Sequence, residues 1–203
     1  MSECHLFGNG PSYKAAPQTS IEHSYGCNIR IAGRPVRAIG CVDSGYAIKR
    51  LILQIRENPD GTGIYVPQAV YRHLIQEVKD LPWIHKNLEY GWSTETRMNY
   101  SFNCGQVMVQ HLCKMYDVIN LWGFDSLSTS SVYSWHHDLP DADLCKIRPT
   151  EVDQMDQHAT WTRSWQKIVQ DLGQKTTIVN NVPTSNGNIN QFVLNEIFED
   201  CGI

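Results

Sequence analysis

A short turn near the amino end of the chain, residues 8–12 with the sequence GNGPS, has the residue types that bind a phosphate. Gly8 and Gly10 lack a Cβ, so their backbone N–H groups can approach a phosphate closely, and a helix that starts after the turn would add free N–H groups. Asn9 and Ser12 can add side-chain hydrogen bonds. The turn matches neither GxGxxG nor the P-loop, which requires GK[ST], so a simple tight turn is the alternative interpretation.

Other polar or glycine residues lie where further short apolar segments end. They are Asn28, Asp43, Gly123 and Asp125. In a mostly parallel α/β sheet the carboxyl ends of the strands share one edge, and ligands bind beyond that edge. We therefore expect these residues to lie near the GNGPS turn and to line the same site.

The combination of GNGPS at residues 8–12, YGCN at 25–28 and GFD at 123–125 resembles the bacterial sialyltransferases of glycosyltransferase family 42 and related short proteins from bacteria and phages. In that family a GNGPS turn ends the first strand and a Cys-Asn pair ends the second. A helix that opens with Ser-Gly precedes a strand that ends in Gly-x-Asp. The resemblance runs from Gly8 to about Pro183. It implies a Rossmann-like fold of the sialyltransferase type, a variant of the GT-A fold.

The resemblance also implies a donor site for a sugar linked to a nucleotide, most simply CMP. Asn9, Gly10 and Ser12 would face the phosphate and ribose. Asn28 would bind the donor near its phosphate or sugar, and Asp125 would lie by the cytidine. The family has a polar loop over the base where this chain has two asparagines, at 180 and 181.

Some positions depart from the family's pattern. The serine that holds the sialic acid carboxylate corresponds to Asn103, and Cys104 replaces the glycine after it. Asparagine can still donate to a carboxylate. Asp43 stands where the bacterial enzymes commonly have asparagine, and a buried carboxylate beside an anionic donor needs a hydroxyl or a cation as its partner. The predicted donor-binding residues are Gly8, Asn9, Gly10, Ser12, Asn28, Asp43, Asn103, Gly123, Asp125 and Asn180.

Glycosyl transfer requires a base for the acceptor hydroxyl and hydrogen-bond donors for the departing phosphate. By the same resemblance His158, just before a predicted helix, is the catalytic base, and a neutral histidine can take a proton near pH 7. Tyr133 would be one of two tyrosines that hydrogen-bond the leaving phosphate, and Leu127 replaces the other. Without the resemblance, His158 is interpreted as a surface histidine near the start of a helix.

A cluster of imidazoles and carboxylates offers a competing site. Its members are His136, His137, Asp138, Asp141 and Asp143. They could bind a divalent metal, although adjacent residues of an extended segment point to opposite sides and the spacing matches no metallohydrolase signature. A metal-dependent hydrolase that uses this cluster with Asp43 is one alternative function. A non-catalytic module that binds a nucleotide or sugar is the other.

Short strands alternate with helices along the chain, which predicts an α/β protein with a mostly parallel sheet and helices on both faces. Strands are predicted at Glu3–Phe7, 25–29, 38–42, Val118–Trp122 and 177–179, and helices at 48–56, 68–79, 103–116, 160–172 and 190–199. Residues 126–156 lack a clear periodicity. Unstructured segments of this length are often functional, so this one is a candidate lid.

The chain has 203 residues, a formal net charge of −4 and 41% apolar residues, which suits one globular domain over residues 1–203. The negative net charge argues against a protein that coats nucleic acids in general. No segment is apolar enough to span a bilayer and none has the pattern of a signal peptide, so we expect a cytoplasmic protein. The seven cysteines are scattered, which predicts buried thiols rather than a disulfide framework or a zinc site.

These features predict a metal-independent glycosyltransferase that moves a sugar from a nucleotide-sugar donor, CMP-linked by the resemblance, to a hydroxyl acceptor. The nucleotide sugar is a substrate, so no cofactor is expected. The expected acceptor is a glycan, and a hydroxyl on a modified nucleobase is kept as an alternative. A homo-oligomer also remains open.

Overall fold

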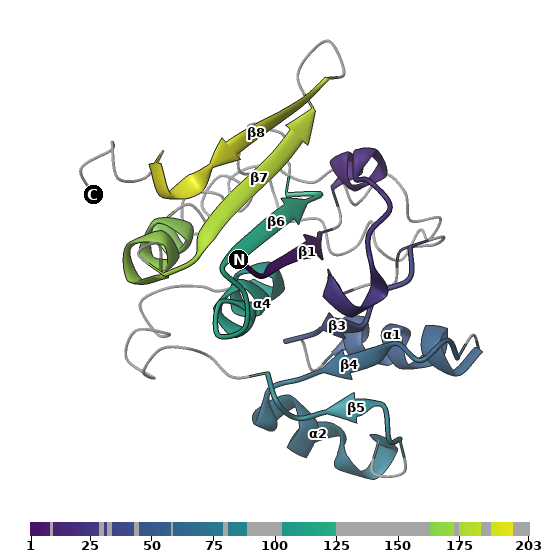
Figure 1. Ribbon diagram of the computed structural model, residues 1–203. Coiled ribbons are helices and arrows are strands. Elements are labelled where there is room, and N and C mark those ends of the chain that lie inside the picture. The colour runs from purple at the N-terminus through teal and green to yellow at the C-terminus, as the bar shows by residue number, and fades with distance from the viewer. Residues whose placement is uncertain are drawn as a thin grey trace, which may run out of the picture.

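The computed structural model describes residues 1–8, 10–28, 31, 34–42, 45–57, 59–78, 81–88, 103–124, 163–172, 175–183 and 188–196. These residues form an α/β fold around one eight-stranded sheet of order β5-β4-β3-β2-β1-β6-β7-β8, which is Rossmann-like in the broad sense (Figure 1). Every neighbouring pair is parallel except β7 and β8, which are antiparallel. The prediction of a mostly parallel α/β sheet is confirmed.

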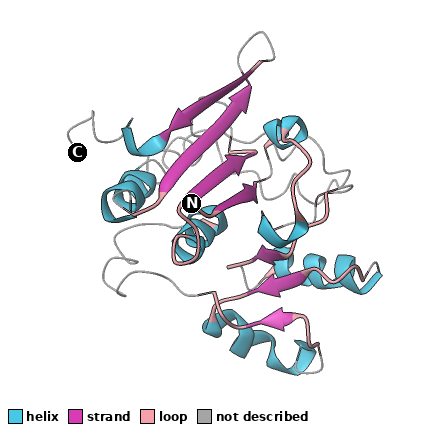
Figure 2. Cartoon of the chain, viewed as in Figure 1, coloured by secondary structure: helices cyan, strands magenta, loops and turns pink. Residues whose placement is uncertain are grey.

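Most of the strands are short, and helical segments lie between many of them along the chain (Figure 2). They are β1 (Glu3–Phe7), β2 (Ser24–Cys27), β3 (Ala38–Gly40), β4 (Gly63–Tyr65), β5 (Ile84–His85), β6 (Val118–Trp122), β7 (Thr177–Pro183) and β8 (Ile189–Val193). The helices are α1 (Tyr46–Glu57), α2 (Gln68–Val78), α4 (Cys104–Leu112) and one over residues 163–172, with short 3-10 helices η1 (Pro11–Ala15) and η2 (Ile21–His23).

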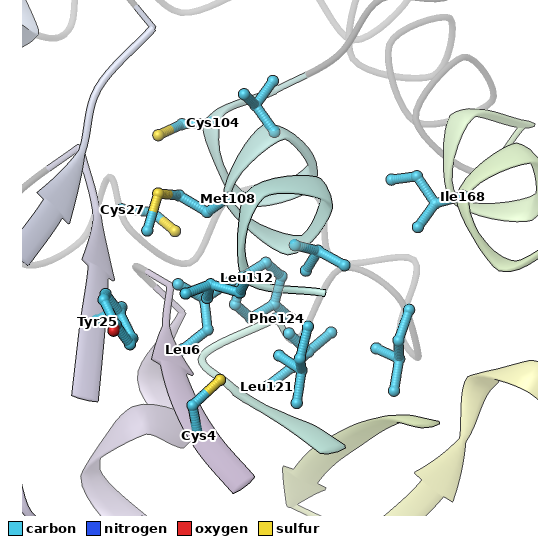
Figure 3. Close-up of a cluster of buried hydrophobic side chains, with 14 of the residues drawn as sticks. Cys4, Leu6, Tyr25, Cys27, Cys104, Met108, Leu112, Leu121, Phe124 and Ile168 are labelled. Carbon is cyan, nitrogen blue, oxygen red and sulfur yellow. The ribbon is translucent and has the colours of Figure 1, made fainter. Parts of the chain in front are cut away.

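Alternating residues of the strands build a core on each face of the sheet, because successive side chains of a strand point to opposite sides. Leu6 belongs to the cluster that includes residues of α4 and of helix 163–172, such as Met108 and Ile168 (Figure 3). Phe7 belongs to the other cluster, which includes buried residues of α1 and α2. Helices therefore cover both faces.

The helix α4 packs closely on the centre of the sheet because β3 presents small residues to it. Ala38 lies in the cluster that holds α4, and a Cβ at Gly40 would collide with the thioether of Met108. Ile39, between them, points to the opposite face and packs with the α1 cluster. This close approach brings the start of α4 to the carboxyl ends of β2 and β3.

The carboxyl-terminal part of the chain differs from its prediction. The strand expected to end at residue 179 continues to Pro183, because its backbone pairs with β6 as far as Asn181 opposite Trp122. The helix expected over 190–199 is wrong for its first half: Ile189–Val193 is the strand β8, paired with β7, and the helical residues are 194–196. Pairing with the outer edge of β7 outweighs the weak helical pattern, since β-branched and aromatic residues favour strands.

The strands β4 and β5 were not predicted, because segments of two or three residues have no measurable periodicity. The prediction of free thiols holds for the five cysteines in the described ranges. Four of them are buried and Cys113 is partly buried. None of the helices in those ranges has the length and apolar character needed to cross a membrane.

Candidate functional site

The order of the strands reverses between β1 and β6. After β1 the chain builds β2 to β5 on one side of it, then returns to place β6, β7 and β8 on the other side. In doubly wound sheets ligands bind at the carboxyl ends of the strands, next to the strands between which the order reverses. We call the carboxyl ends of the parallel strands, with the residues that follow them, the carboxyl edge.

The loops that follow β1 and β6 are hydrogen-bonded to each other at this edge. The Gly8 N–H donates to the Trp122 carbonyl at 2.7 Å, and the Gly10 N–H donates to the Gly123 carbonyl at 2.9 Å. In return the Gly123 N–H donates to the Ser12 hydroxyl oxygen at 2.8 Å, and Ser12 is buried. We call this contact the glycine junction.

Glycine is needed at both sides of the glycine junction because the two backbones nearly touch. A Cβ on Gly123 would lie 2.6 Å from the Gly8 carbonyl oxygen and 2.9 Å from that of Gly10, and Gly123 has a φ of +77°. A Cβ on Gly8 would lie 2.7 Å from the Gly123 carbonyl oxygen. Backbone atoms cannot move aside as a flexible side chain can, so these glycines are required for packing as well as for conformation.

The N–H groups of Gly8 and Gly10 therefore have partners within the chain. The sequence interpretation assigned Gly8, Gly10 and Ser12 to a phosphate, whereas in the structure their backbone or hydroxyl groups bind the loop after β6. These residues shape the carboxyl edge. Asn9 lies outside the described residues.

The helix α4 begins at the same edge and has free donors in its first turn. Its N-cap is Asn103, whose Oδ1 accepts from the Gln106 N–H at 3.0 Å while Gln106 Oε1 accepts from the Asn103 N–H at 2.9 Å. Within the described part of the chain, the N–H groups of Cys104 and Gly105 have no hydrogen-bond partner. Such N–H groups, together with the positive end of the helix dipole, favour an anion.

Asn28 lies beside this first turn, at the end of β2. Its N–H donates to the Gly40 carbonyl at 2.9 Å, and its φ is +63°, a left-handed conformation that asparagine tolerates better than most residues. Its side-chain Oδ1 is buried and finds no hydrogen-bond partner in the described ranges. A buried acceptor without a partner costs about 1–3 kcal/mol, so a ligand N–H or O–H that reached it would stabilise this arrangement.

The Cys104 thiol connects Asn28 to the start of α4. Its Sγ donates to the Gly40 carbonyl at 2.8 Å and lies against the backbone N–H groups of Asn28 and Val42. Burial raises the pKa of Cys104 well above its ordinary value, and the neighbouring Cys27 thiol adds to this effect. Figure 3 shows the two thiols beside Met108. A thiol in this state is a packing group rather than a nucleophile.

Phe124 lies between the start of α4 and the end of β1 at the carboxyl edge. A Cβ on Gly105 would lie 2.5 Å from its ring, and a Cβ on Gly8 would lie 3.1 Å from it. Its ring also makes an edge contact with Trp165 of helix 163–172, with centroids 5.9 Å apart. The start of α4, the end of β1 and the end of β6 therefore converge on one aromatic ring.

Two asparagines of β7 lie at the same level of the sheet, opposite Leu121 and Trp122. Asn180 and Asn181 are fully buried on opposite faces. The Asn181 Nδ2 donates to the Leu121 carbonyl at 3.1 Å, which fixes the orientation of its amide, and its buried Oδ1 has no partner among the described residues. The resemblance places both asparagines at the end of the last strand, where the family has a polar loop; in the structure they lie inside β7, which continues to Pro183.

The remaining predicted site residues lie outside the described residues. They are Asn9, Asp43, Asp125, Tyr133 and His158, together with the segment 126–156 and the histidine and aspartate cluster at 136–143. The structure therefore places Gly8, Gly10, Ser12, Asn28, Asn103 and Gly123 at the carboxyl edge, with Asn180 on β7. Comparisons of the chain with protein-family models, curated proteins and solved structures found no match.

Proposed function

We propose that the carboxyl edge binds a nucleotide sugar and that the chain is a glycosyltransferase of the sialyltransferase-like type. One observation carries this proposal: the first turn of α4, where the N–H groups of Cys104 and Gly105 have no described partner, contacts Asn28 through the Cys104 thiol, and the Oδ1 of Asn28 is buried without a partner in the described ranges. The N–H groups can bind an anion, and the amide oxygen of Asn28 can accept from a hydroxyl. A site with both suits a ligand that joins a phosphate or carboxylate to a sugar ring.

The glycine junction has a different part in this proposal from the one expected for residues 8–12. Its N–H groups already have acceptors in the chain and hold the loops after β1 and β6 together. The anionic group of the donor would therefore bind the N–H groups in the first turn of α4. Asn103 is consistent with this role, because its cap uses Oδ1 and leaves the Nδ2 donor without a partner in the described segments. Asn28 then accepts from a hydroxyl of the ribose or of the transferred sugar.

The chemical step follows the resemblance of the sequence. His158 would take the proton of the acceptor hydroxyl as that oxygen attacks the anomeric carbon, and the bond to the phosphate oxygen breaks. Tyr133 would donate a hydrogen bond to the departing phosphate. The acceptor, a glycan or a hydroxyl on a modified nucleobase, would approach from the side of the sugar.

Calorimetry with CMP, UDP and GDP tests the binding step. We expect CMP to bind without a metal ion, and the Asn28→Gly variant to bind it about three- to tenfold more weakly, since one hydrogen bond is lost. Glycine keeps the left-handed backbone of residue 28, so this change removes the amide alone. The control is Asn190→Ala, on the exposed part of β8, which should bind like the wild type.

Hydrolysis of a CMP-sugar tests the chemical step. The His158→Ala variant should retain CMP binding within about twofold and lose about a hundredfold in rate. Binding without turnover would favour the non-catalytic module, and a strict need for a divalent ion would favour the hydrolase. If none of the nucleotides binds, or if Asn28→Gly and wild type bind equally, the proposed site is wrong.

A further inference from the structure

The two edges of the sheet differ in length. The strand β5 forms one edge with only two residues, and β8 forms the other with five, Ile189–Val193 (Figure 1). Within the described part of the chain, β8 pairs with β7 on one side and no strand lies on its other side. An edge strand keeps a row of backbone N–H and C=O groups to which another strand can bind.

The strand β8 has none of the features that usually protect an edge. Proteins discourage pairing at an edge by a very short strand, a charged side chain or a proline. The strand β5 is short and is followed at once by Lys86. Over residues 188–195, by contrast, the sequence NINQFVLN contains no charged residue and no proline. Another strand could therefore pair with β8 without burying a charge.

The side chains of β8 are also open to contact. Asn190 and Gln191, in the middle of the strand, are exposed, and neither amide has a hydrogen-bond partner in the described ranges. The apolar members of the strand, Ile189, Phe192 and Val193, are only partly buried. Such side chains stabilise a sheet when they pack against those of a neighbouring strand. A further strand beside β8 would therefore bury apolar surface and offer partners to both amides.

The sequence of β8 is complementary to itself in an antiparallel register. When Gln191 lies opposite Gln191 of a second copy, Ile189 lies opposite Val193 and Asn190 opposite Phe192. The two β-branched residues then pair with each other, the central amides can hydrogen-bond, and no like charges meet. This register uses all five residues of the strand. Two-fold symmetry supplies the antiparallel direction, because the same strand serves both copies.

We propose that β8 is a dimer interface and that its partner is β8 of a second copy of this chain. The two sheets join into one across a two-fold axis that passes through Gln191, perpendicular to the sheet. The contact is small, so the dimer dissociates at low protein concentration. The axis turns the carboxyl edges of the two copies in opposite directions, so neither copy covers the carboxyl edge of the other. The dimer is therefore independent of the function proposed for that edge.

Sedimentation velocity over a range of protein concentrations tests this proposal. We expect the mass to rise from that of one chain, 23.2 kDa, to twice that value, with half of the chains associated on the order of 10 µM. The mass of one chain at every concentration up to about 500 µM would overturn the proposal. A mass that keeps rising beyond two chains would do the same, because a two-fold contact closes after two copies.

Charged variants at the axis test the register. Gln191→Lys places two positive charges opposite each other, and Gln191→Glu two negative charges, so each variant alone should associate about tenfold more weakly or worse. Mixed in equal amounts, the two variants should associate within about threefold of the wild type, since a lysine then faces a glutamate. Residue 191 is exposed in the single chain, so neither change should disturb the fold.

The matched control is Gln68→Lys, the same change at an exposed position of α2, and it should associate within about twofold of the wild type. Association of Gln191→Lys as strong as that of the wild type would overturn the proposal. So would a mixture of the two charged variants that associates no better than either variant alone, because residue 191 would then not lie on the axis.

Discussion

Two neighbouring parts of the carboxyl edge differ in how their polar groups are used. At the glycine junction the N–H groups of Gly8, Gly10 and Gly123 each have an acceptor within the chain. At the start of α4, Cys104 and Gly105 keep N–H groups without a partner in the described ranges, and Asn28 nearby keeps an unpartnered oxygen.

This difference shows what a glycine-rich turn does and does not indicate. Missing Cβ atoms permit a close approach, but the partner that approaches can be another loop of the same chain as well as a ligand. Unmet hydrogen-bonding capacity is the more direct mark of a binding site, because buried polar groups normally find partners. On this criterion the first turn of α4 is the better candidate for contact with an anion.

The comparison predicts that substitutions at the junction affect stability most. Gly123→Ala should lower the free energy of unfolding by about 3 kcal/mol or more, because a left-handed φ and close contacts with two carbonyl oxygens act together. Gly61→Ala is the matched control, since Gly61 has a φ of +85° and open space around it, and should cost about 1 kcal/mol. Urea denaturation measures both values, and equal losses would show that the close approach is unimportant.

Ser12→Ala should have the next largest effect. The Gly123 N–H would lose its acceptor in a buried place, which costs about 1–3 kcal/mol. The exposed Ser20, whose side chain makes no cap hydrogen bond, provides the control: Ser20→Ala should change the free energy of unfolding by less than about 0.5 kcal/mol. A loss in Ser12→Ala no larger than that of the control would mean that the loops are held by other contacts.

The free energy of unfolding should also fall in mild acid, because a hydrogen bond between β1 and β6 beside the glycine junction is lost. The Trp122 indole N–H donates to His5 Nδ1 at 3.1 Å, and burial holds the pKa of His5 below its ordinary value of 6.5. The unfolded chain therefore binds more protons between the two pKa values, so the free energy of unfolding falls as the pH falls below about 6.5. The loss should be about 1 kcal/mol, the value of the hydrogen bond that the protonated ring cannot accept.

Denaturation curves across this range of pH, compared for wild type and His5→Gln, measure that effect. Glutamine can accept from the indole but does not titrate, so the variant should lose this part of the pH dependence. His85→Gln, which changes an exposed histidine that does not contribute to the pKa shift of His5, should keep it. An unchanged slope in His5→Gln would assign the acid sensitivity to another group.

The smallest effect on stability is expected at Asn28. Asn28→Gly should change the free energy of unfolding by less than about 0.5 kcal/mol, because glycine suits the left-handed backbone and the greater freedom of glycine in the unfolded chain offsets the relief of the buried, unpartnered oxygen. Asn103→Ala, at the cap of α4, should cost about 1 kcal/mol. A large loss in Asn28→Gly would show that its amide supports the fold, and the contrast between the two parts of the edge would fail.

Most of the described strands and helices were predictable from the local hydrophobic pattern. The bounds of β1 and β6 agree with those of the predicted segments, and α1, α2 and α4 lie within about two residues of theirs at most ends. The strand end at Asn28 was also found, since a polar residue after a short apolar run is a local signal. The strand β8 was not, because its pairing with β7 is a long-range contact that leaves little trace in the order of its own residues.

The sequence by itself determined which residues could sit at the carboxyl edge and that glycine was needed near residues 8 and 123. Only the tertiary structure decided how these residues are used. Hydrogen bonds between the loops after β1 and β6 join groups more than 110 residues apart, and no local pattern reveals whether such a donor meets a distant carbonyl or stays free. The same holds for Asn28: its residue type permits a left-handed turn, but its unpartnered oxygen follows from the way β2, β3 and α4 pack around it.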